Sequence, residues 1–285
     1  MGTSRPVTVE EILVRATAHR WHGADPQSPS STGLLLRQVV EQPDKQDGWA
    51  DYSSPEWRLL SSVWHQGTRY PDAAPLTGFV SELVAEPTCP QRYVLLDLLS
   101  HLAAGYPADV VIDLLVPPGN DTYYWSYPDG RAARDALSAE IRSLYWLLEH
   151  DDFRVRQYVG RLVVFAPSCA HQSAEMLRRA LVAEQHSPTR ALAVLWLAVL
   201  GRLAGDAFAG IEMITSVEPN RPSIEDGYVT LAKFAAGAAD ASALHGVADI
   251  EQVAGEVVFL NHFEGSDMHP QILASNVLHR VERPT

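Results

Sequence analysis

The sequence predicts an all-α protein built from stacked helical hairpins, the arrangement called an α-α superhelix or α-solenoid. Apolar residues recur at i, i+3, i+4 and i+7 through most of the chain, and Gly, Pro, Asp and Ser separate these segments. Pairs of such segments return about every 40 residues, which is typical of helical repeat arrays. No stretch alternates apolar and polar residues between turn signals, so no strand is predicted.

Residues 1–54 are expected to form helices and loops that cap the array. A helix over 9–21 starts after Thr8 and has two glutamates in its first turn, where acidic side chains interact favourably with the helix dipole. A loop rich in Pro, Ser and Gly separates it from a second helix over 34–41.

Residues 55–285 are expected to form one array of helical repeats within a single domain. Each segment carries one apolar stripe, which a surface helix buries against its neighbours. The regular pattern predicts helices over 56–65, 76–86, 90–104, 108–115, 134–150, 153–165, 168–184 and 189–204. A weaker pattern predicts further helices over 207–216, 224–237, 250–262 and 270–281.

Two segments resemble HEAT-like repeat proteins. In Glu-His-Asp-Asp-Phe-Arg-Val-Arg (149–156), Asp152 lies in a turn and Arg156 follows a valine at the start of the next helix, as is common in HEAT repeats. The block over 64–75 looks like segments of HEAT-like proteins from actinobacteria. The resemblance covers about residues 55–205. It implies the solenoid fold and a turn-stabilising ladder through Asp152 and Arg156, but it says little about function.

Composition disfavours several classes of function. The net charge of -13 opposes binding to nucleic acid, which requires clustered Lys and Arg. Cys89 and Cys169 are too few for a disulfide framework or a cysteine-built zinc site. The first residues lack the apolar core of a signal peptide, and the apolar run over 191–201 is shorter than the roughly 20 residues that span a bilayer. A cytoplasmic location without membrane contact is expected.

No phosphate-binding loop, HExxH helix, GxSxG elbow or dinucleotide fingerprint occurs, so no cofactor or metal is expected. An aromatic-rich loop over 117–130 lies between two predicted helices. Long loops in compact helical proteins are often functional. This loop can form the lid or wall of a pocket for an apolar ligand, or its rings can cover a hydrophobic edge. Its candidate binding residues are Tyr123, Tyr124, Trp125 and Tyr127.

His65 and Tyr70 flank a turn that contains Gly67, and Trp64 is adjacent. The turn can present an imidazole and a phenol to one pocket, with Trp64 against the substrate. The alternative is that His65 caps or packs against a helix end.

Asp97 and His101 are four residues apart on one predicted helix and therefore share a face. Asp97 can orient His101 as a base, or the two can form an ordinary surface or inter-repeat pair. Trp146 and Glu149 are three apart on a later helix. A carboxyl group among aromatic rings can have a raised pKa and act as an acid, with Trp146 contacting substrate.

The first functional hypothesis is a cofactor-independent enzyme of secondary metabolism. It would catalyse dehydration, conjugate addition or cyclisation of an apolar, polyketide-like small molecule in a groove of the array. His101 would remove a proton beside a carbonyl, and Tyr70 or His65 would donate a proton to the developing or departing oxygen. Aromatic walls would fold the substrate and exclude water.

Two other classes compete with the enzyme. The commonest use of such arrays is as a scaffold for a protein partner. A DNA glycosylase is also considered, because one glycosylase family has a HEAT-like fold with a cationic groove. The acidic net charge opposes the glycosylase, and only a local group of arginines supports it: Arg154, Arg156, Arg161, Arg178 and Arg179.

Overall fold

The computed structural model is almost entirely helical in the part of the chain that it describes. Within this part the only strands form one two-residue antiparallel ladder, so the prediction of an all-α protein is confirmed. The described residues are 7–22, 31–42, 54–65, 68–116, 128–205, 224–249 and 269–282.

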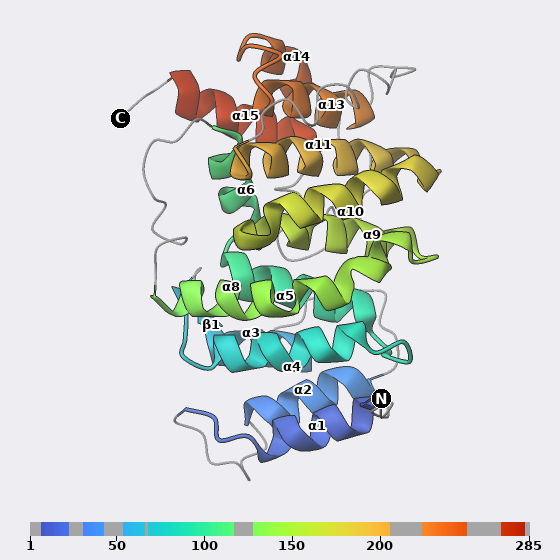
Figure 1. Ribbon diagram of the computed structural model, residues 1–285. Helices are drawn as coiled ribbons and strands as arrows, with labels where there is room; N and C mark the ends of the chain where they lie inside the picture. The colour runs from blue at the N-terminus through green and yellow to red at the C-terminus, as the bar shows by residue number, and fades with distance from the viewer. Residues whose placement is uncertain are drawn as a thin grey trace.

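Helices α1 (Val9–Ala18) and α2 (Thr32–Glu41) form the hairpin at the N-terminal end of the stack in Figure 1. A capping box starts α1, because the Thr8 hydroxyl accepts from the Glu11 N–H and the Glu11 carboxylate accepts from the Thr8 N–H at 2.8 Å. At Gly33 a Cβ would lie 2.8 Å from the carbonyl carbon of Ala16. Glycine therefore permits the close approach of α2 to α1.

The next elements are α3 (Pro55–Val63), strands β1 (Trp64–His65) and β2 (Thr68–Arg69), and helix α4 (Ala73–Ala85). Trp64 pairs with Arg69 across the ladder. Helix α4 packs on α1 and forms a hairpin with α5 (Arg92–Ala104), after which α6 (Pro107–Leu115) follows a short turn.

One long helix is predicted over 134–150, and the structure has α8 (Pro128–Glu140) followed directly by a 3₁₀ helix, η2 (Ile141–Glu149). The second helix of this hairpin is α9 (Phe153–Leu162). Two short 3₁₀ turns, η3 (Val163–Phe165) and η4 (Pro167–Cys169), lead to the hairpin of α10 (Ala170–Ala183) and α11 (Ser187–Leu203).

Three helices of the described chain follow α11: α13 (Ile224–Ala235), α14 (Ala243–Ala248) and α15 (Pro270–Glu282). The patterns over 224–237 and 270–281 predicted α13 and α15, but α14 was not predicted. The helices predicted over 207–216 and 250–262 lie outside the described residues.

Successive hairpins lie on top of one another in chain order (Figure 1). The first helices stack from α1 through α4 and α8 with η2 to α10, and the second helices stack from α5 through α9 and α11 to α13. Residues 95–104 of α5 and 191–201 of α11 are buried on every side of the helix. These second helices therefore form the centre of the core, consistent with their almost continuous apolar sequence.

Among the described helices, none is by itself long and apolar enough to cross a membrane. Together α5 and α6 have sufficient length and apolar composition, but they are bent by 60° where they meet.

Candidate functional site

A cluster of polar side chains lies within the apolar contact between α5 and α9. Asp97 and His101 come from α5 and are each 2% exposed, and Tyr158 and Arg161 come from α9 and are 0% and 3% exposed. The Arg161 Nη2 atom is 2.8 Å from the Asp97 Oδ1 atom. The Arg161 guanidinium also lies over the Tyr158 ring, 5.1 Å from its centroid. These four residues are called the buried polar cluster.

Hydrogen bonding sets the orientation of His101 in this cluster. Its Nδ1 atom is 3.0 Å from the backbone carbonyl oxygen of Asp97 and 4.0 Å from the Asp97 Oδ1 atom. The carbonyl oxygen can only accept, so Nδ1 carries a hydrogen and donates it to the Asp97 carbonyl oxygen. The Asp97 carboxylate binds Arg161, whereas the Asp97 carbonyl group orients the imidazole.

Tyr158 stays protonated in the cluster. Burial raises the pKa of Tyr158 well above its ordinary value, and the nearby Asp97 carboxylate raises it further. The cluster therefore contains a phenol, an imidazole and a paired carboxylate. The Trp64 ring meets the His101 ring edge-on at 6.1 Å, and its Nε1 group donates to the Gly105 carbonyl oxygen at 3.1 Å.

Of the residues that sequence analysis proposed for a site, the structure brings together Asp97, His101 and Trp64. His65 in β1 and Glu149 at the end of η2 are exposed, and Tyr70 is 42% exposed. They lie on the surface rather than in the buried polar cluster.

Trp146 is also on the surface, with 44% of it exposed, and it stacks against Arg92. The proposed loop residues lie outside the described part of the chain: Tyr123, Tyr124, Trp125 and Tyr127.

A second set of polar contacts links the turns of successive hairpins. The Arg156 Nη1 group donates to the carbonyl oxygens of His150 and Asp151 at 2.7 and 2.9 Å, within the turn before α9. Its Nε and Nη2 groups donate to the Glu184 carboxylate at 2.7 and 2.8 Å, in the turn before α11. Burial tends to raise the pKa of Glu184, but the hydrogen bonds that it accepts from Arg156 and from the His186 backbone lower it overall. Arg156 thus joins two turns through charge-assisted hydrogen bonds.

Arg92 makes the corresponding contacts one hairpin earlier. Its Nη2 group donates to the carbonyl oxygens of Glu86 and Pro87 at 2.7 and 2.9 Å, in the turn before α5. Its Nη1 atom is 3.0 Å from the Nε2 atom of His150, in the turn before α9. Arginine side chains therefore connect three consecutive turns, those before α5, α9 and α11.

We call the surface around these turns and η2 the hairpin-turn edge. It is defined by seven residues: Arg92, Trp146, Glu149, His150, Asp151, Arg156 and Glu184.

Asp152, the other residue expected in the ladder, lies at the same edge and bonds within its own turn. Its carboxylate accepts from the Arg154 N–H at 2.9 Å and thereby caps α9. Burial tends to raise the pKa of Asp152, but the hydrogen bonds from the Arg154 side chain and backbone lower it overall. The contact to the next turn comes from Arg156 and not from Asp152.

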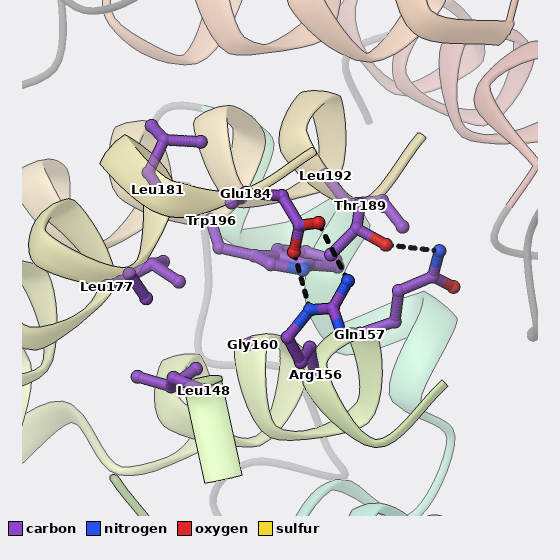
Figure 2. Close-up of a pocket in the computed structure, with 12 residues that line it drawn as sticks. Leu148, Arg156, Gln157, Gly160, Leu177, Leu181, Glu184, Thr189, Leu192 and Trp196 are labelled. Atoms are coloured by element: carbon purple, nitrogen blue, oxygen red, sulfur yellow. Dashed lines mark hydrogen bonds and ion pairs between the residues drawn. The ribbon is translucent and has the colours of Figure 1, made fainter. Parts of the chain in front are cut away.

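A pocket opens between α9, α10 and α11 (Figure 2). Its volume is about 300 Å³, including the part open to solvent, and most of its wall is apolar. The Trp196 indole packs closely against Gly160 of α9 in its lining, where a Cβ on Gly160 would lie 3.1 Å from Trp196 Cδ1. The Arg156 and Glu184 pair is also part of its lining, as Figure 2 shows.

Sequence analysis missed the pairing of Arg161 with Asp97 and the meeting of Gly160 with Trp196. One signal was available, because Arg161 follows Tyr158 by three residues on the apolar stripe of α9. A charge on a buried stripe requires a partner. No group of three or more His, Cys, Asp and Glu side chains among the described residues is placed to hold a metal ion.

Comparison of the chain with protein-family models, with curated proteins and with solved structures gives no significant match.

Proposed function

We propose that the protein is a HEAT-like α-solenoid that acts as a scaffold for a protein partner. The repeated link between hairpin turns carries this proposal, because Arg92 and Arg156 each bind carbonyl groups of their own turn and contact a side chain of the following turn, His150 and Glu184 respectively. The second helices are also joined in register, by the pair of Asp97 and Arg161 and by a 3.0 Å hydrogen bond from Gln157 to Thr189. Regular stacking of this kind creates a long, rigid surface, and such surfaces commonly bind other proteins.

The hairpin-turn edge is the surface that best fits a partner. Trp146 is 44% exposed there, and the Arg92 guanidinium lies 5.3 Å from its ring centroid. Tryptophan and arginine contribute a large share of the binding energy in protein interfaces. The nearby Glu149 and Asp151 side chains are exposed, and the whole chain carries a net charge of -13. The partner surface is therefore expected to be basic.

The test combines capture of a partner with a matched pair of variants. A partner captured from the source cell is purified, and its affinity is measured by calorimetry for the wild type, Trp146→Ala and Val14→Ala. Trp146→Ala should weaken binding at least about tenfold. Val14 is 52% exposed on α1, a helix that contains none of the residues defining this edge, and its replacement should leave the affinity unchanged. Equal affinity for all three proteins would show that the edge is not the binding surface, and the lack of any specific partner would contradict the scaffold.

A second candidate is acid-base chemistry at the buried polar cluster, because Asp97 and His101 lie together in the core as an enzyme would require. The Nε2 atom of His101 would take a proton from beside the carbonyl of an apolar substrate, in a dehydration, conjugate addition or cyclisation. Arg161 would stabilise the negative charge that develops on oxygen. This function ranks second because both α5 side chains are 2% exposed, so helices must move apart to admit a substrate.

The enzyme hypothesis has its own test. Native mass spectrometry and thermal-shift measurements against a panel of apolar carbonyl compounds should identify a ligand that stabilises the wild type. His101→Ala should abolish the stabilisation, whereas replacement of the exposed His65 by alanine should preserve it. If both variants respond as the wild type does, the cluster is not the site.

A further inference from the structure

His269 caps the start of α15 and is fully buried there, with 0% of it exposed. Its carbonyl oxygen accepts the first hydrogen bond of the helix, from the Leu273 N–H at 3.0 Å. Its side chain also takes part, because the Nδ1 atom accepts from the Gln271 N–H at 3.3 Å. A ring that titrates near neutral pH therefore occupies a cap position where serine, threonine, asparagine and aspartate are preferred.

This cap requires a neutral imidazole. A nitrogen that accepts a hydrogen bond carries no hydrogen, so the hydrogen of the neutral ring is on Nε2. Protonation would place an N–H on Nδ1, opposite the Gln271 N–H, and the cap bond would be lost. It would also bury a positive charge at the N-terminal end of a helix, where the helix dipole disfavours cations. The buried Nε2 atom has no hydrogen-bond partner within the described part of the chain, so no carboxylate there offsets the added charge.

The residue after His269 is packed closely between two helices. Pro270 lies against α13, where a Cβ on Gly227 would be 2.7 Å from the Pro270 Cβ atom. The same Cβ would lie 3.2 Å from the side chain of Val247 on α14. Glycine at position 227 therefore permits the close docking of this end of α15. A protonated His269 ring reaches water only if this end of the helix leaves its place.

Helix α15 lies at the C-terminal end of the stack, where it packs on α6, α13 and α14 (Figure 1). The residues that it buries there are Pro270, Leu273, Ala274, Val277 and Leu278. In a linear array each element contacts mainly its neighbours, so an element at the end can open while the rest stays folded.

We propose that α15 is an acid-released latch, held on α6, α13 and α14 by neutral His269 and freed when this residue takes up a proton. Burial lowers the pKa of His269 below its ordinary value of 6.5. As the pH falls through 6.5, the released helix therefore binds a proton on this residue before the docked helix does. The docked state is fully favoured above this pH and loses stability below it. The latch goes beyond the proposed scaffold function and does not depend on it.

The neighbouring charged groups act differently. Burial raises the pKa of Asp109 on α6, so its protonation in acid favours the docked state. His245 of α14 lies 3.2 Å from Glu282 of α15, and its protonation strengthens that contact. The other titratable and charged groups of these helices do not bond to the His269 ring in the described part of the chain: Asp113 of α6, Glu225, Asp226, Tyr228 and Lys233 of α13, Asp249 after α14, and His279 and Arg280 of α15.

The test measures hydrogen exchange of the full chain at pH 7.5 and pH 5.5, corrected for the intrinsic effect of pH on exchange. The protection of residues 271–282 should fall in acid by up to about tenfold. Tenfold is the limit for a group with a pKa of 6.5 in the released helix that binds no proton in the docked one. At both pH values α15 should be less protected than residues 191–201 of α11, because it opens locally.

Two histidine variants separate the latch from other effects of acid. In His269→Asn the side chain still accepts from the Gln271 N–H and does not titrate, so the protection of α15 should no longer fall in acid. His279→Asn replaces an exposed histidine of the same helix and should lose protection in acid as the wild type does.

A measurement on the wild type applies even if asparagine disturbs the docking of α15. Nitrogen-15 spectra of the eleven histidine rings, with the His269 ring assigned through its own backbone, should show its hydrogen on Nε2 at pH 7.5 and titration below pH 6.5.

The proposal is overturned if His269 titrates at or above pH 6.5, or if the protection of α15 in the wild type does not fall in acid. It is also overturned if His269→Asn loses protection as steeply as His279→Asn. Equal protection of α15 and α11 would show that α15 opens only when the whole stack unfolds, which contradicts a latch. None of these results bears on the binding of a protein partner at the hairpin-turn edge.

Discussion

Arg161 of α9 and Asp97 of α5 form an ion pair of 2.8 Å between side chains that are only 4% and 3% exposed. The cost of removing two charges from water offsets much of their attraction, so such a pair adds little stability compared with apolar residues of the same size. It is costly to break, because the remaining partner is then a buried charge. We infer that this pair sets the register between two successive second helices.

Replacement of Asp97 by asparagine should therefore destabilise the protein strongly. The variant preserves the shape of the side chain but leaves the Arg161 charge without its carboxylate in the core. The expected loss is about 3–5 kcal/mol in the free energy of unfolding, measured by urea denaturation.

The exposed pair of Arg179 and Glu175 on α10 is the control, with side chains 66% and 49% exposed. Glu175→Gln should cost less than about 1 kcal/mol. Similar losses for the two variants would show that burial does not govern the Asp97 contact.

The link between hairpin turns predicts that replacing two arginines at the same position of their helices will change the stability of the protein by different amounts. Arg156 is the fourth residue of α9 and binds Glu184, whereas Arg190 is the fourth residue of α11, is exposed and makes no ion pair within the described residues. Arg156→Ala should lower the free energy of unfolding by about 1.5–3 kcal/mol, because it removes charge-assisted hydrogen bonds. Arg190→Ala should change it by less than about 0.5 kcal/mol. Equal effects in urea denaturation would argue against the link.

Much of the helical structure was predictable because each helix needs an apolar stripe. The pattern over 90–104 predicted α5 (Arg92–Ala104), and the pattern over 189–204 predicted α11 (Ser187–Leu203). The start of α8 was missed because Pro128-Asp-Gly130 is typical of a turn, although proline also suits the first position of a helix. Local patterns of this kind indicate that an element exists more reliably than where it begins.

The candidate site was predictable only in its local part. Spacing placed Asp97 and His101 on one face of a helix, and they do lie together. Arg161, which binds Asp97, is separated from it by 64 residues of sequence. Such a contact depends on how helices pack, and no single-helix pattern contains that information. The meeting of Gly160 with Trp196 was unpredictable for the same reason.

Gly130 should be one of the least replaceable glycines. A Cβ there would lie 2.6 Å from the guanidinium carbon of Arg69, which is 1% exposed and cannot move into solvent. Burial lowers the pKa of Arg69 to about 10, and the nearby Arg134 charge contributes to the shift. Gly130→Ala should therefore lower the free energy of unfolding by about 1–3 kcal/mol.

Gly78 in α4 is the matched control, because nothing lies within 4 Å of a Cβ built there. Gly78→Ala should stabilise the protein by up to about 1 kcal/mol, since alanine favours the helix. If thermal unfolding shows that Gly130→Ala and Gly78→Ala change the stability of the protein in the same direction, this account of Gly130 is wrong.

His150 should make the stability of the protein depend on pH below neutrality. The Asp152 backbone N–H donates to the Nδ1 atom of His150 at 3.0 Å, and the Arg92 Nη1 atom lies 3.0 Å from its Nε2 atom. Burial lowers the pKa of His150 below its ordinary value of 6.5, and the Arg92 charge lowers it further. As the pH falls through 6.5, the unfolded chain therefore binds a proton on this residue before the folded chain does.

The free energy of unfolding should consequently decrease between about pH 7 and pH 5, and His150→Gln should show a smaller decrease than the wild type. Urea denaturation at several pH values measures this difference, and replacement of the exposed His171 on α10 by glutamine is the control. If His150→Gln loses stability with acid as steeply as the His171 variant does, protonation of His150 does not weaken the link between the turns. A shallower loss in the His150 variant alone would locate the acid sensitivity at the contact of Arg92 with the turn before α9.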